Sequence, residues 1–224
     1  MSIFVALAEV FSPIRCAGCD LPGAVLCPAC AGELPLIDAR CSCRRCGADC
    51  GRRECGECRD RDFAFTRAVC AGRLEPPLSR LITVHKDAGE RRYAAALGEL
   101  LLSACEPWRG WPDAVSAIPP SREALARRGF DHTRVLANTV ATGLGIPVVS
   151  LLGVARRQDQ RALTREQRFA NMQGSFHLQP GAQPRGRILL VDDVFTTGAT
   201  LDGAARVLLA AGADEVRVAA VARA

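Results

Sequence analysis

Two adjacent carboxylates and a threonine-rich turn form the segment in which we expect chemistry. Asp192 and Asp193 follow the apolar run Arg187–Val191, and the residues Thr196, Thr197, Gly198, Ala199 and Thr200 then lead into a helical stretch. Ligands bind outside the carboxyl ends of strands in open α/β sheets, and free N–H groups at a helix start attract anions. The turn therefore predicts a cup for a monophosphate, in which Gly198 lets the backbone approach the ligand closely.

The two carboxylates suit a different part of the same ligand, because like charges repel. Asp192 and Asp193 would bind sugar hydroxyls or a metal-bound sugar, so the whole segment predicts a ribose 5-phosphate group. It matches neither the Walker pattern GxxxxGK[ST] nor the dinucleotide turn GxGxxG. The plain alternative is an ordinary helix cap, although two unliganded acids after a buried strand would form a costly like-charge pair.

Ten of the twelve cysteines lie between Cys16 and Cys58, and eight of them form four CxxC pairs. One CxxC turn presents two sulfurs to a metal, and two such turns complete the tetrahedral four-cysteine site that zinc prefers. The pairs form a near-repeat with gaps of seven and eight residues. Sequential pairing is the simplest arrangement, and interleaved pairing remains open. The predicted ligands of two structural zinc ions are Cys16, Cys19, Cys27, Cys30, Cys43, Cys46, Cys55 and Cys58.

A disulfide framework is the main alternative to zinc. The opening residues lack a basic region and carry Glu9 within their apolar stretch, so we expect a short amphipathic helix, not a secretory signal. A cytoplasmic location with reduced thiols follows, and no apolar run reaches the ~20 residues that membrane insertion needs. A redox pair is disfavoured, because nothing helical follows any CxxC. Cys70 and Cys105 are expected in the core, whereas Cys41 and Cys50 are alternative ligands if one pair is assigned wrongly.

Basic residues elsewhere suggest contacts to a pyrophosphate group. Lys86 is the only lysine and precedes a turn, while Arg122, Arg127 and Arg128 follow a short strand that ends at Ile118. Solvated surface cations are the alternative for each of them. The arginine-rich stretch 156–168 would form a flap over the site or a nucleic-acid contact.

The elements that must position these residues alternate between strand and helix. Strands are expected at 68–73, 114–118, 148–152, 187–191 and 216–221, and helices at 93–103, 134–144 and 201–213. This alternation predicts an α/β fold with a parallel sheet covered on both faces. The cysteine-rich region ends near Asp62, so we expect two domains, residues 1–62 and 63–224. The first carries eight arginines and nine acids, and the second carries 21 basic and 15 acidic residues.

The segment VDDVFTTGAT resembles the phosphoribosyl pyrophosphate (PRPP) motif of type I phosphoribosyltransferases. The cysteine module, LITVHK around Lys86, RRGFDH at 127–132 and QDQRALTREQRFANMQGSF at 158–176 resemble the ComF family of competence-associated proteins. Two departures occur: the family's usual GFNQ is GFDH here, with Asp131 and His132, and its usual PVP is Ile118-Pro119-Pro120. We expect His132 on the surface or at a helix cap, with a contact to substrate as the alternative.

The resemblance implies a phosphoribosyltransferase-like core behind a double zinc ribbon. Asp192 and Asp193 would hold the ribose hydroxyls, and Thr196–Thr200 the 5-phosphate, with Lys86 and Arg128 as further substrate contacts. Transfer of the phosphoribosyl group would release pyrophosphate, with Mg²⁺ offsetting its charge. The alternative is a non-enzymatic accessory factor for DNA uptake that binds single-stranded DNA or DNA-uptake proteins. Few aromatic residues, 5% of the chain, weigh against this second reading.

Overall fold

The computed structural model describes residues 14–87, 90–154 and 176–224 of this chain. The helices are α2 (Pro28–Gly32), α3 (Leu78–Asp87), α4 (Ala94–Cys105), α5 (Arg122–Arg128), α6 (His132–Leu144) and α8 (Ala199–Ala210). The strands are β1 (Arg67–Arg73), β2 (Ala114–Ala117), β3 (Leu152–Val154), β4 (Phe176–Leu178), β5 (Arg187–Phe195) and β6 (Glu215–Arg223). Short 3₁₀ helices span Gly56–Cys58, Arg91–Tyr93 and Glu106–Trp108.

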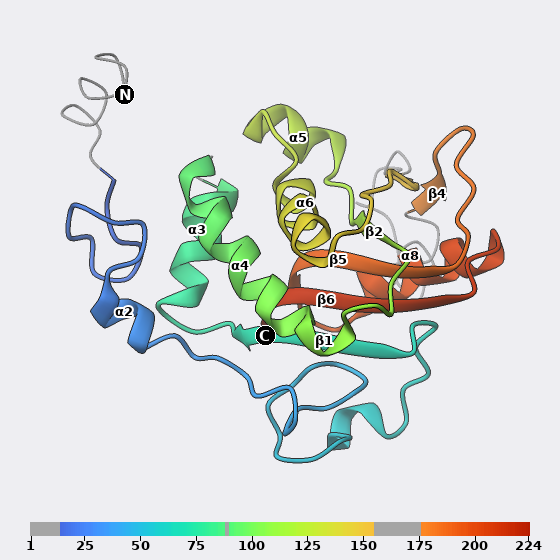
Figure 1. Ribbon diagram of the computed structural model, residues 1–224, viewed down its shortest axis with the longest axis horizontal. Helices are drawn as coiled ribbons and strands as arrows, with labels where there is room; N and C mark the ends of the chain where they lie inside the picture. The colour runs from blue at the N-terminus through green and yellow to red at the C-terminus, as the bar shows by residue number, and fades with distance from the viewer. Residues whose placement is uncertain (1–13, 88–89, 155–175) are drawn as a thin grey trace, which may run out of the picture.

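The central sheet has the strand order β1-β6-β5-β2, and every neighbouring pair is parallel. Figure 1 shows α3, α4 and α6 on one face of this sheet, with α8 on the opposite face. β3 and β4 form a separate antiparallel pair. The α/β class, the parallel sheet and its cover on both faces are therefore confirmed.

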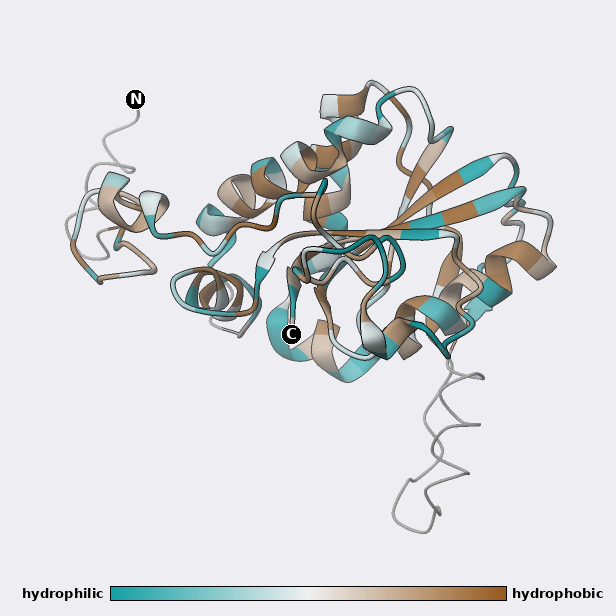
Figure 2. Ribbon diagram, turned by 90° about the horizontal axis from the view of Figure 1, so that it is seen from below, coloured by the Kyte–Doolittle hydropathy of each residue, from teal (hydrophilic) through white to brown (hydrophobic). Residues whose placement is uncertain are grey.

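Alternation along β5 explains how one strand serves two apolar layers, because successive side chains of a strand point to opposite faces. Leu189 and Val191 pack in the cluster that contains α4 and α6 residues, whereas Ile188 and Leu190 pack in the cluster that contains α8 residues. All four side chains are buried. Polar and apolar residues alternate along the surrounding helices, as Figure 2 shows.

The first four-cysteine unit, Cys16–Cys30, and the second four-cysteine unit, Cys43–Cys58, pack on opposite faces of the sheet. The first contacts the α3 face, where Tyr93 Oη donates a hydrogen bond to the Arg15 carbonyl at 2.6 Å and the Arg80 guanidinium donates to the Gly18 carbonyl at 2.6 Å. In the second, Cys43, Cys46 and Cys58 join the apolar cluster of the α8 face. The boundary proposed at residue 62 thus separates sequence regions that share one apolar cluster.

The segment between the two units covers the free edge of β1. The Ile37 N–H donates to the Ala71 carbonyl at 3.0 Å, and the Arg73 N–H donates to the Pro35 carbonyl at 2.8 Å. These bonds satisfy backbone groups that an uncovered edge strand would expose. The chain thereby crosses from one face of the sheet to the other.

Two of the expected strands differ from the structure. Val148 makes only an isolated bridge to Val115, and the regular strand begins at Leu152, where it pairs with β4. The strand expected to end at Val191 continues to Phe195, because Asp192 and Val194 remain in register with β6. The helix expected in residues 1–13 lies outside the described residues. Within the described part of the chain, none of the helices has the length and apolar character needed to traverse a bilayer.

Candidate functional site

The carboxyl end of β5 turns sharply into α8. Gly198 precedes α8 with φ of 82°, and a Cβ at this position would lie 2.7 Å from Phe195 Cζ, so the turn requires glycine. A glycine cap offers no side chain to the first turn of α8, and Thr196, Thr197 and Thr200 are exposed. Thr197 Oγ1 accepts a hydrogen bond from the Ala199 N–H at 3.3 Å, and the three exposed hydroxyls lie at the start of α8, where an anion would bind.

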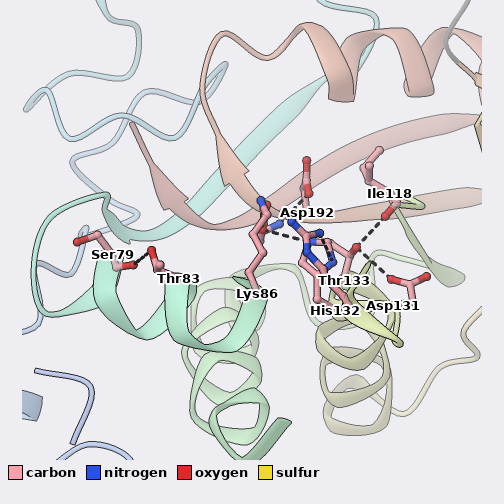
Figure 3. Close-up of polar contacts among 10 residues, drawn as sticks. Ser79, Thr83, Lys86, Ile118, Asp131, His132, Thr133 and Asp192 are labelled. Carbon is pink, nitrogen blue, oxygen red and sulfur yellow. Dashed lines mark hydrogen bonds and ion pairs between the residues drawn. The ribbon is translucent and has the colours of Figure 1, made fainter. Parts of the chain in front are cut away.

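Asp193 is held from two helices at once. Lys86 Nζ, in the last turn of α3, lies 2.6 Å from Asp193 Oδ2, and His132 Nε2, in the first turn of α6, lies 3.1 Å from the same oxygen. Figure 3 shows Lys86 and His132 reaching toward the same strand end from these two helices. Burial alone would raise the pKa of the Asp193 carboxyl, but the His132 hydrogen bond and the Lys86 ammonium outweigh it and lower that pKa. Asp193 is therefore ionised.

Asp192 has the opposite electrostatic character. Its half-buried carboxyl accepts a hydrogen bond from the Asp193 N–H at 2.8 Å. Burial and the neighbouring Asp193 charge raise the pKa of Asp192 well above its usual range. A cation or hydroxyl donor placed beside this carboxyl would stabilise its ionised form.

The structure links Lys86 and Arg128 through His132 and Asp193. Arg128 Nη1 lies 3.3 Å from His132 Nδ1, so a continuous chain of polar contacts runs from α5 to β5. Arg122 and Arg127 lie on the same short helix α5, with exposed side chains. The arginine-rich stretch at 156–168 lies outside the described residues.

His132 is the site residue that sequence reasoning misplaced. It is buried, 5% exposed, and the capping role belongs to Asp131, whose carboxylate accepts a hydrogen bond from the Arg134 N–H at 2.9 Å. The expectation of a surface or capping histidine was therefore wrong. The departure from GFNQ to GFDH marked the position, but only the packing of α6 against β5 shows its contact.

His85 adds a second buried imidazole behind His132. It is 1% exposed, its ring meets Phe130 edge-on at a centroid distance of 5.4 Å, and burial lowers its pKa. Lys86 lies beside His85 in the last turn of α3 and directs its charge toward Asp193.

The eight paired cysteines gather into two clusters in the sequential pairing. Cys16, Cys19, Cys27 and Cys30 form one, and Cys43, Cys46, Cys55 and Cys58 form the other; within each, the four sulfurs lie within 4.8 Å of one another. Four thiol ligands at this separation fit a zinc ion, so each cluster could hold one. Among the other cysteines, Cys70 and Cys105 are buried in the core as expected.

The two clusters share the same backbone construction. The Cys16 N–H donates to the Leu21 carbonyl and the Cys43 N–H donates to the Ala48 carbonyl, both at 2.8 Å and both five residues ahead. The Cys27 N–H donates to Cys16 Sγ and the Cys55 N–H donates to Cys43 Sγ, both at 3.3 Å. The near-repeat in the sequence therefore corresponds to a repeated turn suited to a metal, in which N–H groups support the first thiol of each cluster.

Comparison with known proteins agrees with this architecture. The phosphoribosyl transferase domain family matches residues 126–224. DNA utilization protein YhgH of Salmonella typhi is 31% identical over 220 residues, which cover 92% of this chain and 95% of the relative. Competence protein F of Haemophilus influenzae is 28% identical over 206 residues, which cover 87% of this chain and 90% of the relative. Similarity to these relatives over nearly the full length, together with the phosphoribosyl transferase domain match and the two four-cysteine clusters of this chain, shows that the chain belongs to the ComF family.

Proposed function

We propose that the chain binds PRPP at the carboxyl end of β5 and transfers its phosphoribosyl group to a nitrogen acceptor. The observation that carries this proposal is the position of Asp192 and of Asp193, which Lys86 and His132 contact, at the end of β5 just before the glycine-capped start of α8. Thr196–Thr200 would bind the 5-phosphate through hydroxyls and N–H groups. Asp192 and Asp193 would accept hydrogen bonds from the ribose hydroxyls.

The cations around Asp193 suit the leaving group. The Lys86 ammonium carries three N–H donors, so it can keep its ion pair with Asp193 and still donate a hydrogen bond to a pyrophosphate oxygen. Arg128 reaches the same region through His132. In the proposed transfer, the bond between C1 and the pyrophosphate oxygen breaks, a bond between C1 and the acceptor nitrogen forms, and the acceptor loses a proton. The protein supplies positioning and fixed charge.

Two metals accompany this proposal. Zn²⁺ would bind the two four-cysteine clusters in a structural role, because all four ligands in each are supplied by the protein and no position is left for substrate. Mg²⁺ would enter with PRPP, since carboxylates and phosphate oxygens are the ligands that it prefers. It would supply positive charge to the pyrophosphate.

Calorimetry with Mg²⁺–PRPP tests the binding step. We expect saturable heat for the wild-type protein and loss of binding by at least about tenfold for Asp192→Asn. Asp214→Asn is the matched control, because Asp214 is an exposed acid just before β6, at the opposite end of the sheet. Absence of heat in the wild type, or equal heat in wild type and Asp192→Asn, would refute the site. A pyrophosphate-release screen over bases and amines then tests transfer.

A second candidate function is binding of single-stranded DNA or DNA-uptake proteins by a cytoplasmic accessory factor. The names of the two relatives, a competence protein and a DNA utilization protein, favour it. The excess of basic over acidic residues after residue 62 also supports it. Its test is binding of a labelled oligonucleotide over a salt series, since phosphate contacts weaken steeply with salt.

A further inference from the structure

A second concentration of positive charge lies at the opposite end of the sheet from Asp193. A cavity of about 280 Å³ opens between the second four-cysteine unit, the amino-terminal end of β1 and the 3₁₀ helix after α4. All the charged residues that line it are arginines, namely Arg40, Arg44, Arg53 and Arg67. None of these belongs to the site proposed for PRPP.

Backbone hydrogen bonds bring three of these arginines together. The Arg44 N–H donates to the Arg53 carbonyl at 2.8 Å, and the Ala68 N–H donates to the Arg44 carbonyl at 2.8 Å, next to Arg67. Arg44 also lies between the ligands Cys43 and Cys46. These bonds place Arg44 and Arg53, both in the second four-cysteine unit, beside Arg67 at the start of β1, so that the three form one set around the cavity.

Most of the charge of this set is not neutralised by other residues that the structure describes. Arg40 pairs with Asp38 at 2.9 Å. In the described part of the chain, by contrast, no carboxylate forms an ion pair with Arg44, Arg53 or Arg67. Three guanidinium groups around one cavity, none of them paired with a described carboxylate, create a site for an external anion.

The cavity fits a segment of a polymeric ligand better than a whole small molecule. Its volume is slightly below the roughly 300–1,000 Å³ typical of small-molecule pockets, and the side chains of Arg44 and Arg53 are exposed beside it. The half-buried Trp108 contributes an aromatic wall. Cationic grooves with an aromatic platform bind single-stranded nucleic acid, because phosphates meet the cations and bases stack on the ring.

We propose that Arg44, Arg53 and Arg67 bind the phosphate groups of a single-stranded nucleic acid, one base of which packs on Trp108. This inference rests on the second candidate function and gives it a place in the fold. It assigns the second four-cysteine unit a binding role besides its structural one. The nucleic-acid site and the PRPP site then lie at opposite ends of one parallel sheet.

Fluorescence anisotropy with a labelled oligothymidylate of about 16 nucleotides, lacking a 5′-phosphate, tests the proposal on the full zinc-loaded chain. The double variant Arg44→Gln/Arg53→Gln should lose at least about tenfold in affinity at low salt. The slope of log affinity against log salt should fall by about 0.7 for each lost phosphate contact. Arg52→Gln removes the same charge from the same loop, outside the cavity lining, and should change affinity less than about twofold.

Further variants separate binding from folding and from the PRPP site. Arg67→Gln lies outside the four-cysteine unit and should also weaken binding, while Arg44→Lys should restore part of it. Zinc content verifies that the second cluster is intact in every variant. Asp192→Asn should lose PRPP and retain the oligonucleotide, so the two sites can fail independently. Unchanged affinity in the double and Arg67→Gln variants, absence of oligonucleotide binding by the wild type, or binding of inorganic phosphate alone would overturn the proposal.

Discussion

Lys86 Nζ lies 2.6 Å from Asp193 Oδ2, so the only lysine of the chain is bound to the carboxylate at the end of β5. This pair joins α3 to the sheet at the candidate site. Asp193 is 8% exposed and Lys86 is 30% exposed at their side chains, so the pair is partly shielded from solvent. Its strength therefore affects both the stability of the fold and the geometry offered to a ligand.

Removal of the lysine charge should destabilise the protein. Lys86→Gln leaves the buried Asp193 with His132 alone, and we expect the free energy of unfolding at neutral pH to fall by about 1–3 kcal/mol. Because the folded-state pKa of Asp193 is lowered, its stabilisation is present above the ordinary aspartate pKa and disappears as pH falls through the lower folded value. The difference between wild type and variant should therefore shrink below about pH 4.

Denaturant titrations over a pH series measure this effect. Lys86→Arg is the control, because it retains the positive charge with a different donor geometry. A pH-independent difference for Lys86→Gln, or an equal loss in Lys86→Arg, would contradict the assigned ion pair.

Neutralising Asp192 should have the opposite effect on stability. The folded-state pKa of Asp192 is raised, so its ionisation costs stability as pH rises above the ordinary aspartate value. We expect Asp192→Asn to be more stable than wild type by about 1 kcal/mol at neutral pH. The gain should vanish toward pH 4, while PRPP binding is lost. Thermal unfolding at both pH values checks the sign, and a variant less stable than wild type at neutral pH would refute it.

Gly198→Ala should deform the predicted phosphate cup. Both the φ of 82° and the approach of 2.7 Å to Phe195 Cζ oppose a Cβ at this position. We expect a loss of about 2–3 kcal/mol in stability and loss of PRPP binding. Gly181→Ala is the control, because Gly181 has a similar φ of 78° with no atom within 4 Å of the added Cβ. Equal unfolding midpoints for the two variants would show that the Phe195 contact contributes nothing.

The two four-cysteine clusters should differ in their importance for folding. Cys43 is buried in the apolar cluster that includes Ile188, whereas Cys19 is an exposed member of the first cluster. Cys43→Ser should bind one zinc ion fewer and should no longer unfold in a single cooperative transition, because the second four-cysteine unit covers part of the sheet. Cys19→Ser should lose one zinc ion but keep the α/β core folded.

Zinc analysis and near-ultraviolet circular dichroism measure both outcomes. Cys41→Ser is the control, since Cys41 is exposed and lies outside both clusters, and it should retain two zinc ions. Retention of both ions in Cys43→Ser would exclude Cys43 as a ligand.

Short-range patterns were sufficient for much of this protein. The alternation of apolar strands and helices predicted the positions of β1, β2, β5 and β6, because strand and helix periods are set within a few residues. CxxC spacing predicted the two sulfur clusters for the same reason, since one tight turn aligns both thiols. The spacing left the pairing of the CxxC turns open. The structure shows the sequential pairing, because the sulfurs of consecutive CxxC pairs lie together beside the repeated turns at Cys16 and Cys43.

The contacts of the candidate site required the tertiary structure. Asp192 and Asp193 belong to β5 because hydrogen bonding to β6 extends the strand past Val191. His132 reaches Asp193 across 61 residues of sequence. Charge pairing depends on which side chains the packed helices bring within a few ångströms, and Coulomb energy at such distances depends on burial as well as separation. The sequence by itself determined which groups could do chemistry, and the placement of the ends of α3 and α6 beside the end of β5 determined which of them act together.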